Sequence, residues 1–212
     1  MEILAHRGAW TAPHERNTLA ALESAWRRGH GVETDLRDLD GEVVVSHDPP
    51  RSSDRHGFSL SALLESWTAL GRPGRLALNI KSDGLAPAVT RSLQSADAVE
   101  RAFVFDMAVP DQLAYDRAGV PVLTRWSEIE APVWSPGARG LWLDAFTDDT
   151  WWDEAEVRAQ LERGRQVVLV SPELHGREHA ATWTRVRAAR LHLHAGFALC
   201  TDHPDEAEEF FA

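Results

Sequence analysis

The 212-residue sequence is short of several residue types, and each shortage excludes a class of structure. A single cysteine, Cys200, excludes an internal disulfide and a metal site built from several thiolates. No apolar run is long enough for a membrane span, and the N-terminus has neither the basic nor the apolar region of a signal peptide. We therefore expect a cytoplasmic protein without a membrane span, in which Cys200 is a buried strand residue.

Positive charge is also scarce. The formal net charge of −11 argues against a nucleic-acid-binding protein, which needs a basic face. Lys81 is the one lysine among 22 basic residues, and a compact ammonium does not replace a guanidinium, so we take Lys81 as a candidate functional residue. With 43% hydrophobic residues and no linker or repeat, the chain is predicted to form one domain over residues 1–212, of unknown oligomeric state.

Short apolar runs alternate with amphipathic stretches along the chain. The predicted strands are 3–5, 32–36, 76–81, 102–105, 120–124, 140–143, 167–170 and 197–200, with a hairpin strand at 43–45 after the turn at Asp40-Gly41. The predicted helices are one between Thr18 and Gly29, then 59–67, 85–93, 110–118, 151–162, 178–190 and 204–211, while 49–57 is a polar loop. Alternation of this kind predicts a parallel sheet, and eight units predict a closed (β/α)₈ TIM barrel of the α/β class.

Polar residues gather where the predicted strands end. In a barrel these ends form one mouth, where active sites occur. The residues concerned are His6, Arg7, Glu33, Asp35, Asn79, Lys81, Asp106, Arg125, Asp144, Glu173 and Asp202.

Glu33 and Asp35 lie two apart on a strand, so both carboxylates point to one face. Two adjacent carboxylates repel each other unless a proton or a cation lies between them, and oxygen ligands suit Mg²⁺ or Ca²⁺. The hairpin brings His47 toward them, so His6 and His47 are predicted to divide proton removal from proton donation. A zinc site using both histidines is the alternative.

Several motifs, in their order and spacing, resemble the glycerophosphodiester phosphodiesterase family: His6-Arg7-Gly8, Asn17-Thr18, Glu33-Thr34-Asp35, His47-Asp48-Pro49, Asn79-Ile80-Lys81 and Thr201-Asp202-His203-Pro204. The resemblance implies a phospholipase-C-like phosphodiesterase barrel that hydrolyses a small-molecule glycerophosphodiester with a divalent cation. It implies that His6 and His47 are the acid–base pair and that Arg7 and Lys81 hold phosphate. Glu33, Asp35 and Asn79 would be the metal ligands.

The chain departs from the family pattern at three places. Asn79 stands where the family has a glutamate, Glu15 lies slightly before the position of another family glutamate, and the loop after His47 is short. Related toxin phospholipases form a cyclic phosphate, so hydrolysis and cyclisation both stay open. Two other functions are considered: a catalytically weakened barrel that binds a phospho-ligand as a sensor or scaffold, and a sugar-phosphate isomerase or aldolase with Lys81 as a Schiff-base amine.

Overall fold

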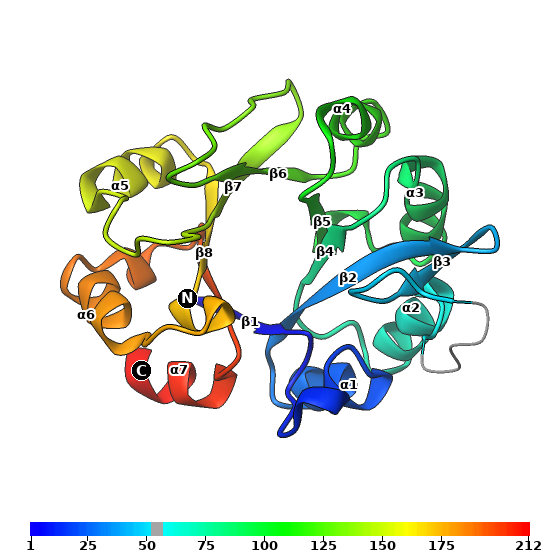
Figure 1. The fold of residues 1–212 in the computed structure, drawn as a ribbon, viewed down its shortest axis with the longest axis horizontal. Helices are drawn as coiled ribbons and strands as arrows, with labels where there is room; N and C mark the ends of the chain where they lie inside the picture. The colour runs from blue at the N-terminus through cyan, green and yellow to red at the C-terminus, as the bar shows by residue number, and fades with distance from the viewer. Residues whose placement is uncertain (52–56) are drawn as a thin grey trace.

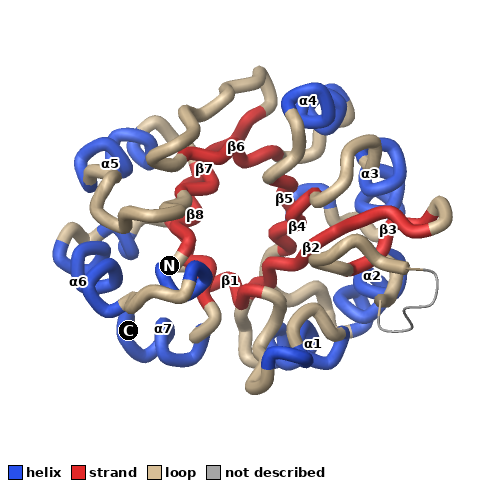
Figure 2. The backbone as a smooth tube through the Cα atoms, viewed as in Figure 1, coloured by secondary structure: helices blue, strands red, loops and turns tan. Residues whose placement is uncertain are grey.

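The computed structural model describes residues 1–51 and 57–212, and most of the loop predicted over 49–57 lies outside them. Eight parallel strands close into a barrel, which Figure 2 shows as a ring of strands with helices outside it. The barrel strands are β1 (Glu2–His6), β2 (Gly31–Leu39), β4 (Leu76–Ile80), β5 (Ala102–Phe105), β6 (Val122–Trp126), β7 (Ala138–Leu143), β8 (Gln166–Val170) and β9 (Phe197–Thr201).

The strand order confirms the predicted (β/α)₈ TIM barrel. Hydrogen-bonded neighbours run β1-β9-β8-β7-β6-β5-β4-β2, and a pairing between β1 and β2 closes the ring. A ninth strand, β3 (Glu42–Val45), pairs antiparallel with the end of β2 (Figure 1). Asp40 and Gly41 both have positive φ at the turn between them, as the predicted hairpin requires.

Helices surround the barrel (Figure 1). They are α1 (Leu19–Arg27), α2 (Leu60–Ala69), α3 (Ala86–Ser95), α4 (Val109–Arg117), α5 (Glu154–Glu162), α6 (Ala180–Ala188) and α7 (Pro204–Phe211), with short 3₁₀ turns η1 (Pro13–Glu15), η2 (Val99–Arg101), η3 (Pro172–His175) and η4 (Leu191–Leu193). The Thr18 hydroxyl accepts a hydrogen bond from the Ala21 N–H, and the Ser59 hydroxyl accepts one from the Ala62 N–H, so these residues cap α1 and α2. None of the described helices is long and apolar enough to cross a membrane.

The apolar side chains form an inner layer and an outer layer. Inside the barrel, Leu4, Phe103, Phe105 and Trp142 pack with Cys200, which is fully buried as predicted. Two further clusters fill the space between strands and helices. The barrel interior is therefore a packed core.

Some predicted boundaries were wrong by two or three residues. The sixth strand in chain order, predicted over 120–124, is observed as Val122–Trp126, so Arg125 lies inside the strand instead of after it. Pro121 has no N–H to donate to a strand ladder, which explains the later start. The helix predicted over 151–162 begins at Glu154 because Asp153 caps it through the Ala155 and Glu156 N–H groups.

Candidate active site

A pocket of about 540 Å³ opens at the carboxyl ends of the barrel strands. Six of the seven residues predicted for the site line it: His6, Arg7, Glu33, His47, Asn79 and Lys81. The seventh, Asp35, is fully buried directly behind them. The structure therefore brings all seven together, although they come from four separate segments of the chain.

The His6-Arg7-Gly8 turn is fixed by its backbone. Arg7 has φ of 57° and Gly8 has φ of 90°, and a Cβ on Gly8 would lie 2.5 Å from the Ala21 carbonyl carbon. Only glycine fits so close to α1. The Arg7 N–H donates to the Glu33 carbonyl (2.9 Å), which ties the turn to β2 and points the Arg7 side chain at the mouth.

Two cations and one amide hold the carboxylate of Asp35. Arg7 Nε lies 3.0 Å from Asp35 Oδ2, Lys81 Nζ lies 3.4 Å from Oδ1, and Asn17 Nδ2 donates to Oδ2 at 2.8 Å. Burial by itself raises the pKa of Asp35, but the charges of Arg7 and Lys81 outweigh it and the pKa lies below its usual value. Asp35 is therefore ionised, and it positions both cations.

The pKa of Glu33 is shifted in the opposite direction to that of Asp35. Its burial, followed by the neighbouring Asp35 charge, raises the pKa of Glu33 well above the usual value. Asp35 Oδ1, Glu33 Oε2 and Asn79 Oδ1 are all buried, and the structure gives none of them a hydrogen-bond partner. Asp35 and Asn79 are register partners on β2 and β4, so their side chains start from neighbouring positions.

Three buried oxygens without hydrogen-bond partners fit a hard cation such as Mg²⁺ or Ca²⁺. We call Glu33, Asp35 and Asn79 the oxygen cluster. Within residues 1–51 and 57–212, no group of three or more His, Cys, Asp or Glu side chains has the arrangement of a metal site. The oxygen cluster has two acids, and its third oxygen is the Asn79 amide.

His6 is held by an aspartate from the far end of the chain. Its Nδ1 lies 2.7 Å from Asp202 Oδ1, and its Nε2 lies 3.9 Å from Glu33 Oε2. Since Asp202 can only accept when ionised, the proton is assigned to Nδ1, and the Nε2 lone pair faces the oxygen cluster. Burial lowers the pKa of His6, and the hydrogen bond to Asp202 opposes that shift.

His47 differs from His6 in exposure. Its side chain is 47% exposed, against 12% for His6, and its Nδ1 lies 2.8 Å from Asp48 Oδ1. Arg37 fixes the backbone beneath it, because Nε donates to the His47 carbonyl (2.7 Å) and Nη1 to the Lys81 carbonyl (3.1 Å). The His6 imidazole is thus largely shielded beside the carboxylates, whereas the His47 imidazole is about half exposed to solvent.

Two acids near the site, Glu15 and Glu173, have partners outside the oxygen cluster. Glu15 accepts hydrogen bonds from the Thr11 and Ala12 N–H groups, which lower its pKa to about 2 and hold it on its own turn. The amide of Asn17 occupies the place beside Asp35 instead. Glu173 accepts from the Asp202 N–H (3.0 Å) and the Thr201 hydroxyl, so it supports the His6 partner.

Four further residues of the mouth have no role in the sequence-based prediction. Asp106, Arg125, Asp144 and His175 line the part of the pocket that is formed by the ends of β5, β6 and β7 and by η3. The strand-end pattern located the first three. His175 lies on η3, which is too short for a hydrophobic periodicity in the sequence to predict it.

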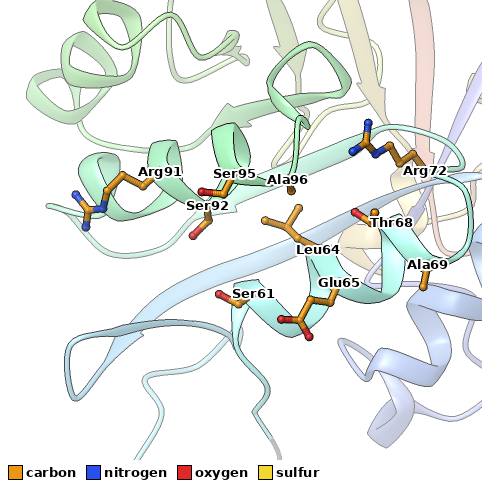
Figure 3. A pocket seen from close by; sticks show the side chains of 10 residues that line it. All are labelled: Ser61, Leu64, Glu65, Thr68, Ala69, Arg72, Arg91, Ser92, Ser95 and Ala96. Atoms are coloured by element: carbon orange, nitrogen blue, oxygen red, sulfur yellow. The ribbon is translucent and has the colours of Figure 1, made fainter.

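A larger hollow of about 760 Å³ lies outside the barrel, between α2 and α3 (Figure 3). Its charged side chains, Glu65, Arg72 and Arg91, point away from one another in this view, and Arg72 pairs with Asp97. The mouth pocket, in which ionisable groups converge, is therefore the better candidate for chemistry.

Comparison with known sequences finds neither a matching family model nor a matching curated protein. Solved structures do match. A glycerophosphodiester phosphodiesterase from Parabacteroides distasonis aligns with TM-score 0.73 and 16% identity, over 99% of this chain and 96% of its own. A glycerophosphodiester phosphodiesterase from Agrobacterium tumefaciens aligns with TM-score 0.69 and 18% identity, over 100% of this chain and 98% of its own.

A third match is an Oleispira antarctica phosphodiesterase in complex with the product sn-glycerol-3-phosphate, with TM-score 0.65 and 17% identity over 99% of this chain and 96% of its own. At these identities the comparisons show that the chain shares the fold of these proteins along nearly its whole length.

Proposed function

We propose that the protein is a metal-dependent phosphoric diester hydrolase that cleaves a small glycerophosphodiester. The observation that carries the proposal is the oxygen cluster. Its three buried oxygens have no hydrogen-bond partner, and the cluster adjoins a pocket lined by His6, His47, Arg7 and Lys81. The shared fold with glycerophosphodiester phosphodiesterases supports the same assignment.

Glu33, Asp35 and Asn79 would hold a divalent cation, Mg²⁺ or Ca²⁺. Bound there, the cation supplies positive charge to a phosphate oxygen. The Asn79 amide contributes an oxygen without a charge, so this site has one negative charge fewer than a site with three carboxylates.

Arg7 and Lys81 would bind the remaining phosphate oxygens. Both line the pocket and both contact Asp35, which orients them before substrate arrives. Negative charge grows on the phosphoryl oxygens in the transition state, and fixed cations at that position stabilise it.

His6 and His47 would transfer the protons. With its Nδ1 proton held by Asp202, His6 can accept a proton at Nε2 from the nucleophile, which is water or a neighbouring hydroxyl of the substrate. The new bond to phosphorus forms as the bond to the leaving oxygen breaks, and His47 protonates that oxygen. Analysis of the products for a cyclic phosphate distinguishes the two nucleophiles.

Asp202 is a positioning residue for His6. The change Asp202→Asn replaces an acceptor by an amide that can also donate, so the Nδ1 proton is no longer held. We expect kcat to fall by about 10²-fold or more with little change in KM, and the pH–rate profile to shift. Arg27→Gln, on the surface of α1, is the control and should leave both constants unchanged. An unaltered kcat in Asp202→Asn contradicts the positioning role.

Metal removal tests the proposed function. The protein is incubated with glycerophosphocholine or bis(p-nitrophenyl) phosphate and Mg²⁺ or Ca²⁺, with and without a chelator. Turnover that disappears with the chelator and returns with added cation is the expected result. Turnover that ignores the chelator contradicts the metal-dependent assignment. Phosphate binding without turnover of any diester supports the sensor alternative instead.

A further inference from the structure

One side of the barrel is covered by a loop where the other sides are covered by helices. β6 is followed directly by β7, and residues 127–137, all of them described, join the two strands between α4 and α5 without forming a helix (Figure 2). We call these residues the connector. Since β6 and β7 are parallel, the connector runs from the mouth to the opposite end of the barrel.

The connector is fixed to the elements on either side of it. The Val133 N–H donates to the Thr124 hydroxyl on β6 (3.0 Å), and Gln112 Nε2 on α4 donates to the Val133 carbonyl (2.9 Å). The guanidinium of Arg165, which precedes β8, lies over the Trp134 ring at 3.8 Å from its centre. The connector therefore presents a surface of defined shape.

Exposed apolar side chains gather on this surface. In the described part of the chain, four of the six exposed large apolar side chains belong to it: Ile129 (75%), Val109 (45%), Val133 (41%) and Trp134 (39%). Val109, at the start of α4, and Val133 line one small hollow, so the two segments lie side by side. We call these four residues the apolar face. Single exposed apolar residues are ordinary, but a group of them marks an interaction surface.

Charges of opposite sign flank the two ends of the apolar face. Glu128 and Glu130 lie where the connector leaves β6, at the mouth, and the Glu130 side chain is 49% exposed. Arg139 and Arg165 lie at the starts of β7 and β8, at the other end of the barrel, and Arg139 is exposed. Within the described residues, Arg165 has only neutral partners. The surface is thus acidic at one end, apolar in the middle and basic at the other end.

This order of charges is self-complementary. A two-fold axis across the connector reverses its direction, so the acidic end of one copy meets the basic end of the other and the two apolar faces meet between them. Each chain has a formal net charge of −11, so two copies attract each other only where opposite charges meet. A nucleic acid or an anionic lipid surface would be attracted at one end and repelled at the other.

We propose that the apolar face and its charged ends form the contact between two copies of this chain in a two-fold homodimer, with the two connectors antiparallel. Trp134 and Arg165 are of the residue types that contribute most to binding energy at protein interfaces. None of these residues lines the mouth pocket, so the inference does not depend on the proposed function.

Sedimentation velocity of the full chain at micromolar concentrations tests the homodimer. We expect a species with twice the 23.6 kDa mass of one chain, which dissociates as NaCl is added because the ion pairs are screened. Trp134→Asp should raise the dimer dissociation constant at least about 30-fold, the effect of losing an interface anchor. Leu193→Asp, on η4, is the matched control, because its side chain is 69% exposed outside the apolar face, and it should stay dimeric.

Charge reversal tests whether the partner is a second copy. Glu130→Arg and Arg165→Glu should each weaken the dimer, because like charges then meet. The double variant, and an equimolar mixture of the two single variants, should associate again, because opposite charges meet in both. Thermal unfolding followed by circular dichroism checks that each variant is folded.

Three results overturn the homodimer: a monomeric wild type, a dimer that Trp134→Asp leaves intact, or single reversals that neither the double variant nor the mixture restores. A monomer that cosediments with phosphatidylglycerol vesicles, and loses that binding in Trp134→Asp, would assign the apolar face to a lipid surface instead.

Discussion

Replacing His6 with alanine is expected to lower kcat for phosphodiester hydrolysis by about 10²–10⁴-fold, the usual contribution of a positioned acid or base. The physical reason is the loss of the His6 Nε2 lone pair, which faces the oxygen cluster while Nδ1 is bonded to Asp202. His47→Ala should lose activity by a similar factor, because in the proposed mechanism His47 protonates the leaving oxygen.

A cation-binding measurement distinguishes histidines that transfer protons from histidines that are ligands of a zinc ion. If His6 and His47 only transfer protons, both alanine variants should bind Mg²⁺ or Ca²⁺ with unchanged affinity in a calorimetric titration. His14→Ala, at an exposed histidine, should match the wild type in both assays. Full activity in the His6 and His47 variants, or loss of cation binding in them, contradicts the acid–base assignment.

Replacing Glu33 with glutamine is expected to weaken cation binding by about 10²–10³-fold. The change keeps the shape of the side chain and removes one of the two carboxylates, and a unit charge a few ångströms from a buried cation contributes several kcal/mol. The converse change, Asn79→Asp, restores the missing charge and should tighten binding. Calorimetric titration with Mg²⁺ and Ca²⁺ measures the cation affinity of each variant.

Glu15→Gln is the control for these charge changes, since Glu15 is bonded to its own turn. It should leave cation affinity as in the wild type. If Glu33→Gln binds the cation as well as the wild type does, the oxygen cluster is not its site.

Much of the barrel could be predicted because its signals are local. Each strand is a short apolar run, and the polar residues at the strand ends identify the mouth without knowledge of distant contacts. The caps at Thr18 and Ser59 and the turn at Asp40-Gly41 are local in the same way. For this reason the confirmed predictions concern the kind and order of elements.

The details of the site depend on contacts between distant segments, which the sequence does not display. Arg7 and Lys81 were predicted to hold phosphate, which stays a prediction, and their contacts with Asp35 could not be read from the sequence. The bond between His6 and Asp202 spans almost the whole chain. His175 could not be found by periodicity, because η3 is too short to have one.

The central claim is that Glu33, Asp35 and Asn79 together hold one divalent cation beside the two imidazoles. The most direct test is a crystal soaked in Mn²⁺, measured with anomalous scattering. This account predicts one strong peak within ligand distance of the side-chain oxygens of all three residues. A peak bonded instead to the imidazole nitrogens of His6 and His47, or no peak at the oxygen cluster, would contradict it.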